Sequence, residues 1–210
     1  MADDFREYTS GDLKVRWSKS RCIHVGNCVG ALPAVFDPER RPWIDPSQAA
    51  TAEVEAAVRA CPTGALQAER VDGTAVETPP PHATIRMAAD GPLLVHGDVV
   101  LDTGAEIRVA LCRCGASVDK PYCDGAHASC GYHEPATAAP RADLPAELGE
   151  GEVEVRATPD GPLMLQGPVE IRNGNDEVVF RGDRAALCRC GGSGNPPYCD
   201  GTHFGIGFRG

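Results

Sequence analysis

A sixteen-residue segment, Cys112-Arg-Cys-Gly-Ala-Ser-Val-Asp-Lys-Pro-Tyr-Cys-Asp-Gly-Ala-His127, occurs twice in this chain. The second copy is Cys188-Arg-Cys-Gly-Gly-Ser-Gly-Asn-Pro-Pro-Tyr-Cys-Asp-Gly-Thr-His203, which begins 76 residues after the first. Eleven of the sixteen positions are identical, and they include the three cysteines and the histidine. Three thiolates and one imidazole make a complete set of four metal ligands, so each copy predicts an inorganic cofactor.

In each copy, the spacing Cys-x-Cys-x8-Cys-x3-His separates the ligands into a close pair of cysteines and a cysteine–histidine pair. The candidate ligands are Cys112, Cys114, Cys123 and His127 in the first copy, and Cys188, Cys190, Cys199 and His203 in the second. Two irons bridged by two sulfides would take two protein ligands each and so use this set completely. Zinc is the main alternative, but paired zinc ligands are usually two to four residues apart, and Cys-x-Cys is closer. The spacing therefore favours iron–sulfur over zinc.

The repeat also covers the chain before the cysteines, where residues 90–97 (Asp-Gly-Pro-Leu-Leu-Val-His-Gly) match residues 160–167 (Asp-Gly-Pro-Leu-Met-Leu-Gln-Gly). Here the offset is 70, so the second copy has an insertion before its first cysteine, around residues 173–176. Short alternating apolar segments predict strands at 84–87, 93–95, 99–101 and 107–111, and at 153–157, 163–165, 169–171 and 178–180. The simplest interpretation is two small β modules, each with one cofactor loop.

The composition favours several small modules. Aromatic residues make up only 5% of the 210 residues, while 24 glycines and 18 prolines suit loop-rich structure. Two segments have the composition of linkers: residues 74–83, which include three consecutive prolines, and residues 134–151, in which 142–148 could form a short helix. We therefore expect domains at 1–75, 76–134 and 135–210.

The first of these domains has a different pattern, in which strands at 13–17 and 66–71 flank a helix at 51–60. Val54, Ala57 and Val58 have helical spacing, Thr51 is the expected N-cap, and Pro62 marks the end of the helix. These elements predict a small α+β module. The fold class expected for the chain is therefore α+β, with this module followed by two small β-rich modules.

A third group of cysteines, Cys22, Cys28 and Cys61, lies in the first domain. Bacterial ferredoxins use a Cys-x2-Cys-x2-Cys run with a remote Cys-Pro, and here Val25 occupies the middle position of the run. Three cysteines suit a 3Fe–4S cluster, which we expect. One alternative is a 4Fe–4S cluster whose fourth iron takes water, hydroxide or a side chain such as that of His24. The other is three buried cysteines with no metal.

The composition also restricts the location and the partners. Neither a secretory signal nor an apolar run of the ~20 residues that span a membrane is present, so we expect a cytoplasmic protein with reduced cysteines. The net charge is −10 without a cluster of Lys and Arg, which argues against nucleic acid as a partner. An acidic surface suits steering toward a basic redox partner, although it suits solubility equally well.

The two copies closely resemble the CDGSH iron–sulfur domain family. The resemblance lies in the pattern Cys-x-Cys-x2-Ser-x3-Pro-x-Cys-Asp-Gly-x-His, with Ser117 and Ser193 at the serine, and it spans roughly residues 83–134 and 150–210. It implies one 2Fe–2S cluster per copy, held by the three cysteines and the histidine, with the histidine-bound iron nearer to solvent. It also implies that the copies pair about a pseudo-twofold axis within a monomer.

Residues 13–71 are similar to the divergent single-cluster ferredoxin family. The matching segments are 21–24 (Arg-Cys-Ile-His), 26–28 (Gly-Asn-Cys), 33–36 (Pro-Ala-Val-Phe), 42–44 (Pro-Trp-Ile) and 61–66 (Cys-Pro-Thr-Gly-Ala-Leu). The resemblance implies a ferredoxin-like module with one cluster, and it leaves the type of that cluster open.

These features predict a protein that transfers electrons through three clusters, with an unidentified reductase or oxidase as its partner. No nucleophile–base pair, phosphate loop or nucleotide fingerprint indicates an enzyme. The alternative function is cluster transfer or redox and pH sensing. Because a neutral imidazole replaces one thiolate, the potentials should be intermediate, and they should depend on pH. Cys130 is expected to pack beside the first loop, and Lys120, with Pro196 as its counterpart, to lie near the histidine-bound iron.

Overall fold

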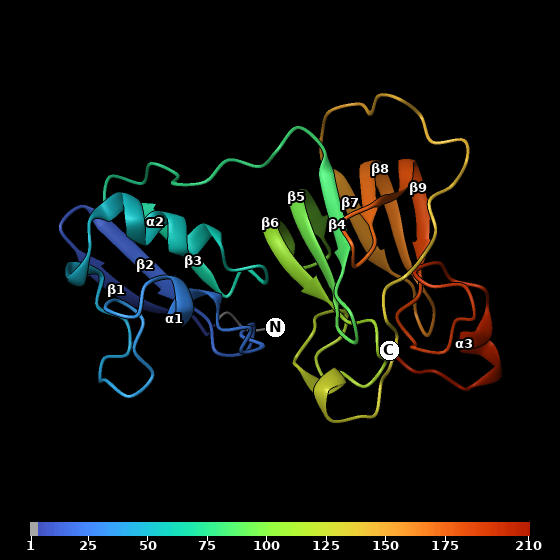
Figure 1. Cartoon of the computed structure of the whole chain (residues 1–210), viewed down its shortest axis with the longest axis horizontal. Coiled ribbons are helices and arrows are strands. Elements are labelled where there is room, and N and C mark those ends of the chain that lie inside the picture. The colour runs from blue at the N-terminus through green and yellow to red at the C-terminus, as the bar shows by residue number, and fades with distance from the viewer. Residues whose placement is uncertain (1–3) are drawn as a thin grey trace. The chain divides into compact units, whose positions relative to one another are not determined.

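The computed structural model describes residues 4–210, which divide into two compact units (Figure 1). One unit ends at Thr78, and the other extends from Pro79 to Gly210. The structure is mostly β with a few short helices, and each unit contains its own sheet. The domain boundaries expected at 75/76 and 134/135 stay a prediction, and the two units are described separately below.

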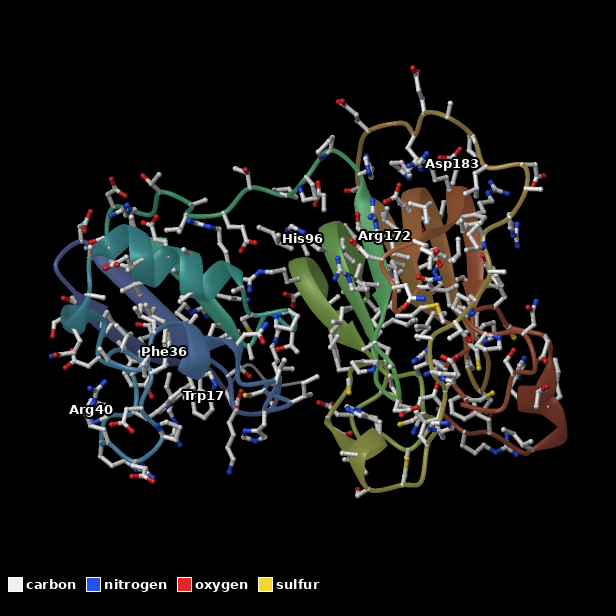
Figure 2. All side chains as sticks on the ribbon, in the orientation of Figure 1. Trp17, Phe36, Arg40, His96, Arg172 and Asp183 are labelled. Carbon is white, nitrogen blue, oxygen red and sulfur yellow. The ribbon has the colours of Figure 1, made fainter. Side chains whose placement is uncertain are left out.

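The first unit is built on a three-stranded antiparallel sheet in the order β1-β2-β3. Its elements are β1 (Arg6–Ser10), β2 (Leu13–Trp17), α1 (Asn27–Ala31), η1 (Pro46–Gln48), α2 (Thr51–Arg59) and β3 (Leu66–Arg70). Leu13 and Val15 point inward from β2 and form a core with Val54 and Val58 of α2. Phe36 belongs to the same core, and Trp17 packs against it (Figure 2). The three predicted elements are present to within one residue, whereas β1 is too polar to have been recognised.

The start of α2 differs from the prediction. The N-cap is Ala50, and Thr51 is the first helical residue, so the assignment of Thr51 as the N-cap was wrong. The Ala50 N–H donates to Glu53 Oε2 at 3.0 Å, while the Glu53 N–H donates to the Ala50 carbonyl oxygen at 2.9 Å. The Glu53 carboxylate thereby organises the first turn without a polar side chain at the N-cap.

The second unit contains one six-stranded mixed sheet, to which both repeats contribute an antiparallel three-stranded meander. The first repeat supplies β4 (Ala83–Met87), β5 (Leu93–Leu101) and β6 (Gly104–Leu111), and the second supplies β7 (Val153–Ala157), β8 (Leu163–Arg172) and β9 (Val178–Leu187). The strands predicted at 93–95 and 99–101 are one continuous strand, β5, with an irregularity after His96. The ligand loops follow β6 and β9 and lie at the same end of the sheet (Figure 1).

The two repeats are joined by the same strand contact made twice. β4 pairs in parallel with β8, with Ala83 opposite Val169, and β7 pairs in parallel with β5, with Val153 opposite Val99. Residues 83 and 153 are equivalent at the offset of 70, as are residues 99 and 169. One buried core runs across both repeats and includes Ile85, Val95, Val155, Leu165 and Ile171. The two predicted β modules therefore share one sheet and one core.

The segment between the repeats contains no helix, so the short helix considered at residues 142–148 is absent. Pro145 lies inside this stretch, where it removes a helical N–H and disfavours helical geometry for the residue before it. The insertion of the second repeat holds this segment instead. Asn173 Nδ2 donates to the Ala138 carbonyl oxygen at 3.0 Å, and the Gly174 N–H donates to the Ala136 carbonyl oxygen at 2.7 Å.

Candidate metal centres

The close cysteine pairs have a spacing that suits a shared metal. The sulfur atoms of Cys112 and Cys114 lie 3.8 Å apart, and those of Cys188 and Cys190 lie 3.6 Å apart. A disulfide requires about 2.05 Å. Two thiolates on one tetrahedral metal, each bonded at about 2.3 Å, lie about 3.8 Å apart. Each pair is therefore spaced to bind one metal atom.

The second ligand pair differs between the repeats. In the first, Cys123 Sγ lies 3.2 Å from His127 Nδ1, so the two atoms can bind one metal. In the second, His203 Nδ1 lies 2.8 Å from the Asp160 carbonyl oxygen, and the buried imidazole packs against Phe204 with 4.0 Å between the ring centroids. The structure thus brings Cys123 and His127 together, while the His203 ring would have to turn to join a metal.

The donors of the first loop lie in two separate pairs. Within residues 4–210, no three His, Cys, Asp or Glu side chains converge on a single metal position. A structural zinc site needs four ligands around one point, whereas a two-iron cluster takes its ligands as two separate pairs. Burial raises the pKa of Cys123 to about 11, and the charge of Cys112 adds to this effect, so the two pairs are close enough to interact. This donor set fits a two-iron cluster.

Each ligand loop is held by the same internal hydrogen bonds. In the first, Ser117 Oγ donates to the Tyr122 carbonyl oxygen at 2.7 Å, and Asp124 accepts from the N–H groups of Val118 and Ala126 at 2.8 and 3.0 Å. The second loop repeats these contacts at Ser193, Tyr198, Asp200, Gly194 and Thr202. This aspartate caps the turn that follows it in both loops. The glycine after it has φ of 87° in both loops, which favours glycine.

The arginine between the two close cysteines also belongs to each loop frame, although the sequence analysis did not identify it. Arg113 Nε donates to the Gly91 carbonyl oxygen at 2.9 Å, and the equivalent Arg189 Nε donates to the Gly161 carbonyl oxygen at 2.8 Å. Both arginines are buried, and Arg113 also pairs with Glu134. Each one ties a ligand loop to the Asp-Gly turn of its own repeat. The sequence could have pointed to this arginine, because Cys-Arg-Cys occurs in both copies.

The N-terminal cysteines surround a common pocket. Cys22, Cys28 and Cys61 line it together with Trp17 and Trp43. Burial raises the pKa of Cys28, and the charges of Cys61 and Cys22 raise it further, so the three sulfur atoms lie close enough to interact. The three cysteines are partly exposed, which differs from the alternative of three fully buried cysteines.

The residues beside the missing fourth cysteine also line this pocket. Val25 occupies the middle position of the run and is 52% exposed. His24 is exposed and has a left-handed backbone with φ of 57°, which is uncommon outside glycine. The structure places His24 near the three cysteines without showing a contact between its ring and a sulfur atom.

The two tryptophans provide a test of what this pocket can hold. Their rings meet edge to face with 4.9 Å between centroids, and both indole Nε1 atoms are buried without a hydrogen-bond partner within residues 4–210. An unsatisfied buried N–H costs roughly 1–3 kcal/mol, so such groups normally find an acceptor. Thiolate and sulfide sulfur atoms would supply acceptors here. Three thiols and two unpaired donors therefore fit an iron–sulfur cluster.

Cys130 does not have the position expected for it. The residue is exposed rather than packed, and its sulfur lies 3.9 Å from the His127 carbonyl oxygen. The packing prediction was wrong, because residues 128–131 are all exposed.

No helix within residues 4–210 has the length and apolar character needed to cross a membrane.

Comparison with known proteins gives two family matches. Residues 8–70 match the family described as "Divergent 4Fe-4S mono-cluster", and residues 90–128 and 160–204 match "Iron-binding zinc finger CDGSH type". Similar curated proteins are both named "Uncharacterized protein YjdI" and come from Escherichia coli K12 and Escherichia coli O157:H7. Each is 36% identical to this chain over 63 residues, which are 30% of this chain and 83% of the relative. No solved structure matches the chain.

Proposed function

Because this chain belongs to the divergent 4Fe-4S mono-cluster family through its N-terminal module and to the CDGSH iron-binding family through its two repeats, we propose that it is a three-cluster electron carrier. In this proposal, Cys22, Cys28 and Cys61 hold the N-terminal cluster. The two 2Fe–2S clusters are held by Cys112, Cys114, Cys123 and His127, and by Cys188, Cys190, Cys199 and His203. When bound, the clusters supply one-electron redox chemistry. The chain binds them and, in the second unit, brings the two ligand loops of the repeats into contact.

The observation that carries the proposal is the meeting of the two ligand loops. Cys114 and Cys190, one proposed ligand from each repeat, lie opposite each other in an isolated antiparallel bridge. Adjacent sites within one chain support exchange of an electron between them, because the covalent link keeps their effective concentration high.

We further propose that the repeats pair about a pseudo-twofold axis, so that a monomer contains the complete pair. The support comes from contacts made twice with the roles exchanged: β4 with β8 and β7 with β5, as well as Cys114 with Cys190. In symmetric dimers, such self-complementary contacts are made between identical subunits.

For the N-terminal module, the proposed cofactor is a 3Fe–4S cluster, because three cysteines satisfy its three irons. The alternative is the 4Fe–4S cluster that the family description names, with a ligand other than cysteine at the fourth iron. Electron paramagnetic resonance separates the two. A 3Fe–4S cluster gives its signal in the oxidised protein, whereas an ordinary 4Fe–4S cluster gives its signal after reduction.

The proposed partner is a basic reductase or oxidase, since the net charge of −10 favours a positively charged docking surface. No substrate chemistry is proposed. Raised ionic strength should slow electron exchange with such a partner, because salt screens the attraction between the two surfaces.

The proposal is tested by purifying the full chain without air and measuring iron, acid-labile sulfide and the resonance spectra before and after reduction. We expect about seven irons per chain with a 3Fe–4S cluster and about eight with a 4Fe–4S cluster, together with reversible reduction. A colourless protein that contains zinc would contradict the proposal.

Cluster transfer is the second candidate function, and one observation favours it: His127 is only half-buried, so its metal bond would be open to solvent. Mixing the loaded protein with an apo-ferredoxin distinguishes the candidates. Rapid loss of colour from this chain to the acceptor favours transfer, whereas clusters that stay in place through repeated reduction favour the carrier.

A further inference from the structure

The two ligand loops differ in charge at one pair of equivalent positions. Lys120 in the first loop corresponds to Pro196 in the second, each directly before the proline that precedes Tyr-Cys. The Lys120 ammonium donates to the Ser117 carbonyl oxygen at 2.5 Å, which fixes it on the loop that carries Cys112. Beside the same cysteine, the Pro121 carbonyl oxygen accepts from the Cys112 N–H at 2.8 Å. The ammonium is thus fixed on the first loop, and the residue directly after Lys120 bonds to the Cys112 backbone.

The second repeat adds a further cation at this place. Lys120 Nζ lies 5.7 Å from the ring centroid of Phe208, and Arg189 Cζ lies 5.3 Å from the same centroid. Phe208 is buried, so both cations contact an aromatic ring from which water is largely excluded. Because Lys120 belongs to the first loop, the ring that it shares with Arg189 places this guanidinium near that loop.

The surroundings of the second loop are closer to neutral. Cys188 shares a pocket with Pro196, and with Arg113, Tyr132 and Glu134 from the first repeat. Arg113 corresponds to Arg189, and its Cζ lies 5.6 Å from the centroid of Tyr132. Here, however, the arginine pairs with the Glu134 carboxylate, and the lysine is replaced by proline. The two loops therefore share the arginine–aromatic contact, and they differ in the additional ammonium and in the carboxylate that pairs with Arg113.

The carboxylate of Asp119 reduces the difference in charge between the two loops. Asp119 precedes Lys120, and its counterpart is the neutral Asn195. Within residues 4–210, the Asp119 carboxylate makes no hydrogen bond or ion pair. The Asp119 backbone N–H donates to Ser117 Oγ, and its carbonyl oxygen accepts from the Tyr122 N–H, both at 3.0 Å. Asp119 and Lys120 are both half-buried, but only the Lys120 ammonium is fixed on the loop by a hydrogen bond, so only its charge has a defined position there.

From this asymmetry we propose that the cluster of the first repeat is the more easily reduced of the two, and that Lys120 is the residue that sets this order. The inference rests on the proposed function, because it requires a cluster in each repeat. Reduction adds one electron from the reductant to the cluster, which gains one negative charge. A fixed positive charge beside Cys112 stabilises that added charge and so raises the reduction potential. The electron would rest on the first repeat and pass through the second only transiently.

The test is a redox titration of the anaerobic, fully loaded chain, followed by electron paramagnetic resonance of the 2Fe–2S signals. Two single substitutions exchange the charges between the loops: Lys120→Gln removes the ammonium, and Pro196→Lys adds one to the second loop. Asp119→Asn is the control for the neighbouring charge. Iron content is measured for each variant, so that a variant that has lost a cluster is recognised.

We expect two reduction steps in the natural protein. Lys120→Gln should lower the step at the higher potential and leave the other in place, so that the difference between the two potentials becomes smaller. Pro196→Lys should raise the lower step, which also identifies that step as the second repeat. Asp119→Asn should move the steps less than Lys120→Gln does.

Other outcomes have distinct meanings. If Lys120→Gln leaves both steps unchanged, or moves only the lower one, the inference is overturned while the carrier function stands. If the two steps coincide in the natural protein, the inference is likewise overturned. If the natural protein shows no 2Fe–2S signal at all, the proposed function itself fails.

Discussion

Cys114 and Cys190 face each other across an antiparallel bridge, and each is followed by a glycine packed against the other cysteine. A Cβ atom on Gly115 would lie 2.5 Å from the Cys190 carbonyl oxygen, and one on Gly191 would lie 2.6 Å from the Cys114 carbonyl oxygen. Both glycines have φ of 79°. The contact between the two ligand loops therefore depends on the absence of a side chain at two equivalent positions.

Gly115→Ala should destabilise the second unit and loosen the contact between the loops. The left-handed backbone costs about 1–2 kcal/mol for alanine, and the clash with the Cys190 carbonyl oxygen adds to that cost. Gly131→Ala is a matched control, because Gly131 has φ of 75° and open space around its Cβ position. Urea unfolding followed by circular dichroism should show a larger loss for Gly115→Ala. Equal losses would mean that the loops are not packed against each other.

The sequence predicted the ligand loops better than the contact between them. The repeated ligands and the capping role of Asp124 follow from local spacing, because the residues involved lie within one loop. The pairing of strands between the two repeats does not follow from local spacing. Ala83 and Val169 are 86 positions apart, and by sequence pattern many strands could pair equally well. The glycines of these strands give no such signal, because a Cβ on Gly97 would meet Ala83 and one on Gly167 would meet Glu152, each within its own repeat.

Arg113→Met should destabilise the second unit because it leaves several buried partners unpaired. The Arg113 side chain is 1% exposed, and it bonds to the carbonyl oxygens of Ala88 and Gly91 and to the Glu134 carboxylate. Removing one member of a buried ion pair costs about 3–5 kcal/mol, whereas an exposed pair contributes about 0–1 kcal/mol. Arg156→Met is the control, since Arg156 is 63% exposed and pairs with Glu154.

A double-mutant cycle measures how much the ion pair between Arg113 and Glu134 contributes to the free energy of unfolding. Arg113→Met combined with Glu134→Gln should cost less than the sum of the two single changes, because the neutral amide no longer leaves a buried charge without a partner. The free energies of unfolding of the four proteins give this coupling. Strict additivity would show that the ion pair does not stabilise the loop.

Asp200→Asn should weaken the second ligand loop in a pH-dependent way. Hydrogen bonds from the Thr202 backbone N–H and side chain, and then from the Gly194 N–H, lower the pKa of Asp200 from 3.8 to about 2. Because the folded-state pKa is lowered, the stabilisation is complete above the unfolded value and is lost as the pH falls from about 4 to about 2. The urea midpoints of the variant and the natural protein should therefore differ at pH 7 and converge in strong acid. A difference that stayed constant down to pH 2 would contradict this account.

Trp17→Phe and Trp43→Phe should each lower the reduction potential of the N-terminal cluster. Hydrogen bonds to the sulfur atoms of a cluster stabilise its reduced, more negative form, and each change removes one unpaired indole N–H beside the three cysteines. Potentials are measured by redox titration, and iron content shows whether the cluster is retained. Replacement of each tryptophan by its benzothiophene analogue keeps the ring shape and removes only the N–H. If the analogue leaves the potential unchanged, the indoles act by packing alone.

Cys130 should be the cysteine that reacts freely in the loaded protein. The other nine cysteines are all proposed cluster ligands, whereas Cys130 is exposed and lies at the position of Ile206 in the second repeat. Iodoacetamide without air, followed by mass spectrometry of the peptides, should therefore label Cys130 and spare the rest, since a metal-bound thiolate does not react readily. Cys130→Ile copies the second repeat and should abolish labelling without loss of iron. Loss of iron in this variant would make Cys130 a ligand, and labelling of Cys112 or Cys188 would show that the corresponding loop holds no cluster.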